Sequence, residues 1–535
     1  MAVYLGSQKA SATSGVTSLT ELNEIAQAAI QATNNANAIP TFVPYVSSDG
    51  VISWSNDKGA ENPAPVNLKE EKFDVKSSSA NVKLYGVAFT GGSNTGTRLY
   101  DAVGFTANVG TDTQTATNDF DNAEIYKDIL PVNRVFKSNG TVEITARYGD
   151  DDFKWDGTNG EVMVEIPLFW YNVWTDELGR ECWAVYSKKV AGAMPSPAHV
   201  CEDGTIVDKY YIAAKKLSVD SNGVGHSISG VLPARDGGLG YNLAAARKLD
   251  SRCCTTTNAE RMTRAILAVV EFATRDLQSV MYDFGTGIYT DNTAYSVQKD
   301  ATSTNTISIT ATAASAFVVG QIVNICTGWV SSDKVTNRTI TAIDKTNNTM
   351  TLSGAAFDVT AGWHIYNLDW QCGTTDTVLT PSGSPVSNTS GKYPCRYRYI
   401  EEPWGGGSEM ITGLRTKRSG EEGFYTYELY EFDHLTDDKG ADSISGMTAT
   451  GIKLPGSDGY QKSIERTRFM PSAPGASTTT YYSDYYWYPR YDVCVCRLGN
   501  HWADGRSLGV FYLDCSSPAS WSFRLRLARL STPGF

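Results

Sequence analysis

Hydrophobic residues recur at helical spacing in two segments of the chain. The first, residues 18–30, opens with Ser18-Leu19-Thr20-Glu21, a capping-box pattern, and continues with apolar residues three and four positions apart. The second runs from Asn258 to Leu277. Its apolar face consists of Met262, Ile266, Val269, Val270 and Ala273. Both segments are predicted to be amphipathic helices, and the second is the longest helix that we expect.

The narrow apolar stripe of the first predicted helix needs a cover. Copies of the same helix would provide one, which predicts a trimeric N-terminal bundle. A helix folded back on its own chain is the alternative. A mass measurement that shows a monomer would exclude the trimer.

Most of the remaining pattern is typical of short strands separated by turns. Residues 75–148 and 160–171 contain short strand-like runs between Gly, Asn and Asp, and the second run closes at Pro167. Residues 36–70 hold prolines around a short strand pair, which indicates an extended connector. Residues 296–367 are rich in Thr, Ser, Ala, Ile and Val and predict a small β insertion, whose removal should leave the rest able to fold.

The composition limits the partners that we expect. The formal net charge of -12 argues against nucleic acid, whose backbone is bound chiefly through Lys and Arg. No apolar run is long enough to predict a membrane-spanning helix, and no signal peptide is visible. The ten cysteines include no CxxC pair and no matching His, so no metal site and no cofactor is predicted. Free, buried thiols are expected instead.

An aromatic run lies near the C-terminus. Between Tyr481 and Tyr491 there are six Tyr and one Trp in eleven residues, interrupted by Ser, Asp, Pro and Arg and not by Leu, Ile or Val. Tyr beside small polar residues and Arg is the composition of a paratope, because Tyr offers a large rigid contact area with few torsions to freeze. We interpret the run as a binding surface, with a structural aromatic belt as the alternative.

The residues after this run resemble the variable proteins of diversity-generating retroelements. The family pattern is approximately R-x-G-G-x-W-x-x-G-x-x-x-G-x-F, followed by W-x-I-G-F-R-L. The matching framework positions are Arg497, Gly499, Trp502, Gly505, Gly509, Phe511, Trp521, Arg526 and Leu527. The sequence departs from the pattern at Asn500 and Arg524, where Gly is usual. The resemblance implies a C-type-lectin-like framework that carries exchangeable binding residues.

The resemblance also implies which residues vary. In these systems the adenines of AAY codons are randomised, which never yields Trp, Lys, Glu, Gln or Met. The segment from Val493 to Leu527 contains no Lys, Glu, Gln or Met, so its tryptophans are expected to be framework. The expected binding face consists of Tyr485, Tyr486, Tyr488, Tyr491, Cys494, Cys496, Leu498, His501, Asp504, Arg506, Ser507, Asp514, Cys515, Ser520, Ser522 and Arg524. For each of them, a polar loop without a ligand is the alternative.

Upstream segments extend the resemblance over most of residues 160–535 outside the insertion. Residues 160–171 are similar to a strand, G-x-VMV-x-IP-x-F-x-Y, that opens the lectin-like domain of phage structural proteins. Residues 397–414 resemble the signature yRGiEN-x-WGN-x-WE-x-x-dG of the formylglycine-generating and lectin-like superfamily. Residues 49–66 resemble a segment near the start of phage tail-fibre proteins.

The formylglycine-generating relatives oxidise a substrate cysteine with paired cysteines, so a Cys-dependent oxidase is an alternative function. Cys494 and Cys496 lie two apart on a predicted strand and should point to the same face. Their spacing differs from that of the family's wider pair, and a catalytic thiol needs a base or cation beside it. Glu401 and Glu402 are interpreted as framework. We therefore expect a binding protein and not an enzyme.

The resemblance implies an α+β, multidomain phage tail receptor-binding protein, assembled in the host cytoplasm and carried on the virion. Its expected partners are a host-cell surface receptor, protein or glycan, other virion tail proteins, and further copies in a homotrimer; nucleic acid and membrane insertion are not expected. An undiversified tail adhesin of the same fold is the third possibility. A nearby nucleotide near-repeat that differs from the coding sequence only at adenines would exclude it.

The expected domain division of the chain is residues 1–35, N-terminal helix; 36–71, connector; 72–159, β-rich spacer; 160–295 and 368–535, the two parts of a C-type-lectin-like domain; and 296–367, its β insertion.

Overall fold

The computed structural model divides the chain into two units, residues 1–83 with 175–180, and residues 84–174 with 181–535. It describes residues 82–535, apart from 236, 286, 289–291, 329–331, 368, 387–389, 500–504, 522–525 and 533–535, together with five strands before residue 82. Those strands are β1 (Val3–Leu5), β2 (Gln8–Ala10), β3 (Phe42–Val46), β4 (Val51–Asn56) and β5 (Val66–Asn67). β3 and β4 form the predicted strand pair of the connector. The helix predicted at residues 18–30 lies outside the described residues and stays a prediction.

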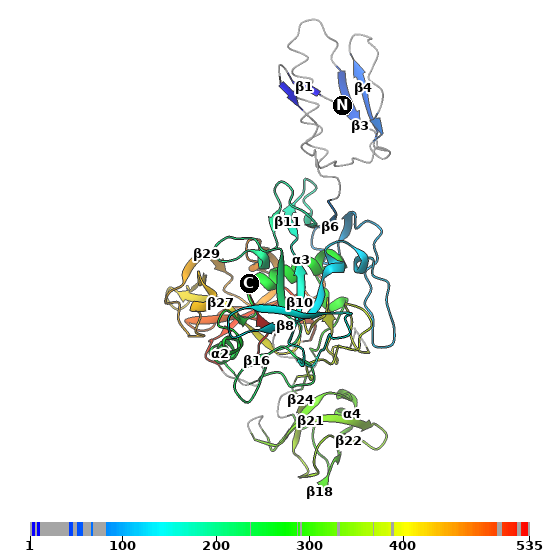
Figure 1. The fold of residues 1–535 in the computed structure, drawn as a ribbon, viewed down its shortest axis with the longest axis vertical. Coiled ribbons are helices and arrows are strands. Elements are labelled where there is room, and N and C mark those ends of the chain that lie inside the picture. The colour runs from blue at the N-terminus through cyan, green and yellow to red at the C-terminus, as the bar shows by residue number, and fades with distance from the viewer. Residues whose placement is uncertain are drawn as a thin grey trace. The chain divides into compact units, whose positions relative to one another are not determined.

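The second unit is rich in sheet and has few helices (Figure 1). The α-helices described are α2 (Leu239–Leu249), α3 (Asn258–Phe272) and α4 (Ala311–Ala316). Short 3-10 helices are η1 (Asp119–Asn122), η2 (Tyr126–Asp128), η3 (Pro197–His199), η4 (Leu277–Ser279), η5 (Leu435–Asp437) and η6 (Gly505–Ser507). No helix among the described residues is long and apolar enough to cross a bilayer.

Three sheets make up most of this unit. The five-stranded sheet has the order β13 (Met194–Pro195), β11 (Trp170–Thr175), β12 (Glu181–Tyr186), β6 (Leu84–Phe89) and β7 (Thr97–Tyr100). The six-stranded sheet has the order β17 (Cys254–Thr255), β36 (Leu530–Ser531), β14 (Lys209–Ala213), β10 (Glu161–Pro167), β8 (Leu130–Phe136) and β9 (Val142–Arg147). The nine-stranded sheet has the order β29 (Thr448–Leu454), β28 (Thr426–Glu431), β27 (Ser408–Ser419), β33 (Val493–Leu498), β34 (Leu513–Ser517), β32 (Tyr485–Trp487), β30 (Gly459–Glu465) and β31 (Met470–Pro474), with β35 (Arg526–Leu527) beside β27. Two small hairpins are β15 (Ser218–Val219) with β16 (Gly225–His226), and β25 (Arg396–Tyr397) with β26 (Ile400–Glu401).

Helix α3 forms where the sequence predicted the longest helix. Its capping box is complete, because the Thr257 hydroxyl accepts from the Glu260 N–H and the Glu260 carboxylate accepts from the Thr257 N–H. The helix ends at Phe272, and the next residue, Ala273, has a left-handed φ of 51°, so the helix does not reach Leu277. Its side chains are buried on all sides, in one cluster with Trp183 of β12. It is a central helix of the core, because its charged side chains are buried together with the predicted apolar face.

The segment predicted as a β-rich spacer shares both smaller sheets with the residues that follow it. β6 pairs with β12 along its whole length, from Leu84 opposite Tyr186 to Phe89 opposite Glu181. β8 pairs with β10 on the other sheet. Apolar residues from both strands enter the cores of the same unit. The boundary expected at residue 159 therefore runs through two sheets, because strand alternation is a local signal and does not reveal which distant strand is the partner.

The segment 297–367, which lies within the second unit, forms its own sheets around its own core cluster. Its core cluster runs from Val297 to Ile365. A hairpin in it has its turn between residues 344 and 349. Within the described residues, the strands of this segment pair only with one another. A two-stranded sheet consists of β18 (Ala301–Thr304) and β23 (Phe357–Val359). A five-stranded sheet has the order β19 (Thr306–Ser308), β22 (Thr349–Leu352), β21 (Asp333–Asp344), β20 (Ile322–Cys326) and β24 (His364–Asn367).

Removing the insertion is expected to leave the second unit folded. The Val297 N–H donates to the Trp363 carbonyl at 2.8 Å, so the two ends of the insertion are neighbours and a short Asn-Gly turn can replace residues 298–362. We expect the thermal midpoint of the shortened protein to lie within about 5 °C of the original, followed by near-ultraviolet circular dichroism. A product that aggregates or melts without a cooperative transition would contradict this expectation.

Candidate functional site

The aromatic run is placed by strand β32 in the nine-stranded sheet. β32 lies between β30 and β34, with Tyr485 opposite Tyr460 and Tyr486 opposite Leu513. Neighbouring side chains on a strand point to opposite faces. Tyr486 accordingly points inward, where it is fully buried and donates its hydroxyl to the Pro455 carbonyl at 3.1 Å. Its neighbours in the run therefore face the other way.

Five half-buried or exposed side chains form a continuous aromatic ridge, which we define as Tyr460, Tyr485, Trp487, Tyr488 and Arg490. The rings of Tyr460 and Tyr485 meet edge to face at 5.0 Å between centroids. Tyr485 and Trp487 follow at 4.9 Å. The Arg490 guanidinium lies 4.8 Å from the centre of the Tyr488 ring and 6.0 Å from that of Trp487. These ring distances lie within the range of favourable aromatic and cation–π contacts.

The carboxylate of Asp458 contacts two residues of the ridge. Asp458 accepts the backbone N–H of Tyr488 at 2.9 Å and pairs with the Arg490 guanidinium at 2.6 Å. The ring of Tyr427, on β28, packs edge to face against Tyr488 at 5.7 Å. Burial and the nearby Asp458 raise the pKa of Tyr485, so its hydroxyl is protonated and can donate at neutral pH. The ridge is thus a fixed surface with polar edges.

Sequence reasoning missed part of the ridge. Trp487 and Arg490 lie inside the aromatic run but were not among the predicted binding residues, and Tyr460 lies on another strand. The run itself was a sufficient signal for the first two residues. The pairing of β30 with β32, which brings Tyr460 to the ridge, has no local signal in the sequence.

A second exposed aromatic pair lies beyond the ridge. Tyr491 and Trp521 are 43% and 42% exposed, and their rings meet edge to face at 5.8 Å. The neighbouring residue Ser520 is exposed and donates its N–H to Asp442 at 3.1 Å. Tyr491 and Ser520 were predicted binding residues. Trp521 was expected to be framework, but its exposure gives it the surroundings of a contact residue.

Two further predicted residues lie at a different place. Arg506 is exposed and pairs with Asp276 at 3.3 Å, and its guanidinium lies 5.8 Å from the centre of the Tyr282 ring. Ser507 follows it on η6 and is half-buried. These two residues therefore lie beside the segment that follows α3 and not on the ridge.

The structure buries another group of the predicted binding residues. Their side chains leave no surface for a ligand, because they fill the interior of the nine-stranded sheet or pair within it. Asp514, for example, forms a buried ion pair with Arg497 at 2.5 Å. The group consists of Tyr486, Cys494, Cys496, Leu498, Asp514 and Cys515. These assignments to an exposed face are wrong in this structure. β33 and β34 are buried on both faces, as Val495 and Leu513 show beside the cysteines, and Tyr486 points to the inner face of β32. The remaining predicted residues, His501, Asp504, Ser522 and Arg524, lie outside the described residues.

Several expected framework positions do have structural roles. A Cβ atom on Gly509 would lie 2.1 Å from a carboxylate oxygen of Asp484, so only glycine fits there. Asp484 is buried and accepts the Phe511 N–H at 2.8 Å, while burial raises its pKa well above the usual range. Phe511 is fully buried against Tyr482 and Trp183.

The thiols near the ridge lack the surroundings of a catalytic cysteine. The Cys494 sulfur receives the Tyr491 N–H at 3.4 Å, and burial raises the pKa of Cys494. Burial and the neighbouring thiol of Cys496 likewise raise the pKa of Cys515. A raised pKa favours the unreactive thiol over the thiolate that an oxidase needs. All ten cysteines are free, and nine of them are buried.

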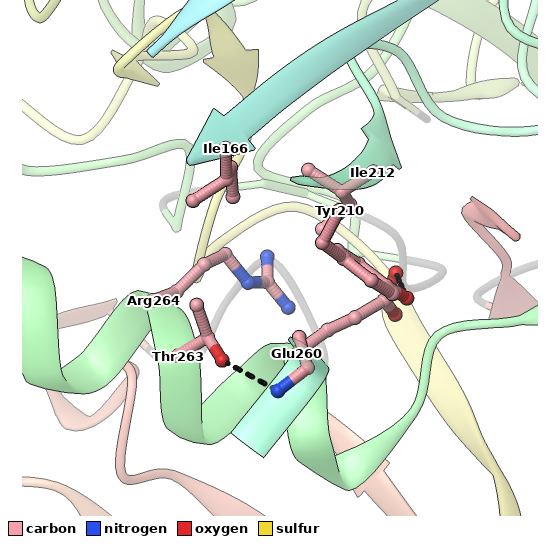
Figure 2. Close-up of a pocket in the computed structure, with 7 residues that line it drawn as sticks. Ile166, Tyr210, Ile212, Glu260, Thr263 and Arg264 are labelled. Atoms are coloured by element: carbon pink, nitrogen blue, oxygen red, sulfur yellow. Dashed lines mark hydrogen bonds between the residues drawn. The ribbon is translucent and has the colours of Figure 1, made fainter. Parts of the chain in front are cut away.

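A buried gap between α3 and the six-stranded sheet is not a ligand site (Figure 2). It is bordered by Ile166, Tyr210 and Glu260 among others, and it is too narrow for a water-sized sphere. The Tyr210 hydroxyl donates to Glu260 at 2.8 Å across it. The gap is a packing feature of the core.

Within the part of the chain that the structure describes, no group of three or more His, Cys, Asp and Glu side chains is arranged to hold a metal ion. No family model matches the chain, and the comparison with curated proteins finds no match. The ridge and the pair formed by Tyr491 and Trp521 make up the candidate binding surface.

Proposed function

We propose that this protein is a phage tail receptor-binding protein, which attaches the virion to a host-cell surface molecule through the aromatic surface near its C-terminus. The binding is non-covalent. The N-terminal residues serve attachment to other tail proteins, and the protein acts as a homotrimer. The C-terminal part has a C-type-lectin-like framework, diversified by a retroelement, as its sequence resemblance implies.

The aromatic ridge is the observation that carries this proposal. Tyr, Trp and Arg are the residues that most often dominate binding energy, and the ridge holds all three in fixed contact. Its rings are already ordered by packing and by Asp458, so little conformational entropy is lost when a ligand binds. Tyr491 and Trp521 add a second exposed contact point.

The arrangement suits binding without chemistry. The thiols beneath the ridge are buried, and the carboxylates Glu401 and Glu409 are buried in ion pairs with Lys215 and Lys216. Weak contacts at one ridge would add up over the copies on one virion, because linked sites raise the effective concentration.

Replacing both Tyr485 and Trp487 with alanine is expected to weaken adsorption by at least about 10-fold. Two aromatic contact residues each contribute on the order of 1–2 kcal/mol when they lie at the centre of an interface. The measurement is the adsorption rate of virions that carry the variant on the host bacterium. Tyr100→Ala is the matched control, since Tyr100 is 49% exposed but lies on β7 of another sheet. Equal adsorption by the double variant and the control would refute the proposal.

One further variant distinguishes receptor binding from the alternative function, a Cys-dependent oxidase. Cys494→Ser is expected to leave adsorption unchanged, because the side chain is buried and its thiol hydrogen-bonds to the Tyr491 backbone. Loss of a turnover activity with binding retained would favour the oxidase.

A further inference from the structure

Two buried thiols lie beneath the ridge on neighbouring strands. The Cys515 thiol, on β34, donates to the Cys496 sulfur, on β33, and the two sulfur atoms are 3.5 Å apart. Both side chains are fully buried, in the same core cluster as Tyr486 and Leu513. This pair was not anticipated, since the sequence predicted that Cys496 would lie near Cys494.

The strands place the two cysteines within reach of a disulfide. β33 and β34 are antiparallel, and the pairs Val495–Ser517 and Arg497–Asp514 flank the cysteines on both sides. A disulfide needs the sulfur atoms at about 2.05 Å and the Cβ atoms about 4 Å apart. The sulfur atoms, now 3.5 Å apart, must approach by roughly 1.5 Å.

We propose that Cys496 and Cys515 form a disulfide bond when the protein meets a peroxide, a two-electron oxidant, outside a reducing cell. The bond links β33 to β34 at the base of the segment 497–514. It goes beyond the proposed function, because its formation needs no receptor.

The reaction balances with peroxide alone. The thiolate of one cysteine attacks an oxygen of hydrogen peroxide, the O–O bond breaks, and a sulfenic acid and hydroxide form. The hydroxide takes up the proton that the thiol has lost and becomes water. The sulfur of the second cysteine then attacks the sulfenic sulfur, the S–S bond forms, and the S–O bond breaks. The leaving oxygen departs as water with the proton of the second thiol, so two thiols and one peroxide give one disulfide and two waters.

Burial makes this oxidation slow in the folded protein. Burial raises the pKa of Cys515, which leaves little of the reactive thiolate. Burial also keeps peroxide away from the pair, so the strands must open locally before the reaction can begin. A reduced pair is therefore expected at assembly, and an oxidised pair after long exposure or after folding in the presence of oxidant.

The bond is expected to stiffen the support of the ridge. It closes a loop of about 20 residues, which lowers the entropy of the unfolded chain. β34 is also the parallel neighbour of β32, with Trp487 opposite Asp514. The cross-link therefore fixes the strand on which the ridge rests.

The test uses the full chain, treated with hydrogen peroxide both in the folded state and during refolding from urea. We expect a loss of about 2 Da and a disulfide-linked peptide pair that joins Cys496 to Cys515 and separates on reduction. The thermal midpoint should rise by about 3 °C or more, and dithiothreitol should reverse the rise. Cys515→Ser should abolish the mass loss and the rise. Cys372→Ser, which removes another buried thiol, should preserve both.

Three outcomes would overturn the proposal. The pair could remain as free thiols under both conditions, one of its sulfurs could be oxidised to a sulfinic acid, or another cysteine could be found linked to Cys496. Near-ultraviolet circular dichroism of Cys515→Ser checks that the variant folds. If it does not, peptide mapping of the unsubstituted chain still decides between a linked and an unlinked pair.

Discussion

Replacing Arg398 with methionine is expected to lower the free energy of unfolding of the second unit by about 3–5 kcal/mol. Arg398 is 1% exposed and forms a two-pronged ion pair with the fully buried Glu271 of α3, at 2.5 and 3.0 Å. Burial alone would lower the pKa of Arg398, but the Glu271 carboxylate outweighs it and holds that pKa above its usual value. Without the guanidinium, the buried Glu271 carboxylate loses its ion pair and keeps the Asn118 hydrogen bond at 2.8 Å, and Asp121, which pairs with Arg398 at 2.8 Å, also loses its partner.

A surface ion pair provides the matched control. Arg490 pairs with Asp458 at a similar distance, 2.6 Å, but its side chain is 43% exposed. Arg490→Met should therefore cost no more than about 1 kcal/mol. Replacing Glu271 together with Arg398 by apolar residues should recover most of the loss, since the buried charge disappears. Urea unfolding followed by tryptophan fluorescence measures all three variants, and an Arg398→Met protein as stable as Arg490→Met would contradict the expectation.

The same ion pair shows what the sequence could and could not predict. The apolar spacing of α3 is a local signal, and it was read correctly. Its capping box, Thr257 with Glu260, is a second local signal, which the prediction did not use. The other side of the helix holds charged residues, which local reasoning assigns to solvent. Tertiary partners allow their burial: Arg398 neutralises Glu271, and the carbonyls of Arg468 and Phe469 accept from Arg261. Such pairing depends on the tertiary fold and has no periodicity.

The candidate site divides along the same line. Composition alone identified the aromatic run, and strand alternation could have separated Tyr486 from its outward neighbours. The position of Tyr460 and the meeting of Cys496 with Cys515 depend on sheet order, which places β30 and β34 beside strands distant in sequence. The spacer boundary failed for the same reason, because β6 and β8 find their partners beyond residue 160.

Acid is expected to destabilise the protein through His199, between about pH 6.5 and about pH 4. The His199 ring is fully buried, donates from Nε2 to the Ile166 carbonyl at 3.0 Å, and has no partner at Nδ1. Burial lowers its pKa from 6.5 to about 4. In this pH range the unfolded chain binds a proton that the folded chain does not, so stability falls as the pH falls and the loss levels off below the folded pKa. The loss amounts to about 3 kcal/mol.

His199→Gln isolates this contribution, because its amide can still donate to the Ile166 carbonyl but does not titrate. The unfolding free energy of the original protein minus that of His199→Gln should fall by about 3 kcal/mol as the pH is lowered from 7 to 4. Taking this difference cancels the titration of the carboxylates that both proteins share. His434→Gln is the control, since His434 is exposed and its hydrogen bond to Glu202 raises its pKa, the opposite sign. If the two curves of unfolding free energy against pH stay parallel over this range, His199 does not cause the acid sensitivity. The sensitivity must then come from buried carboxylates such as Glu409. Lys216 and Arg529 hold the pKa of Glu409 below its usual value, against the effect of burial.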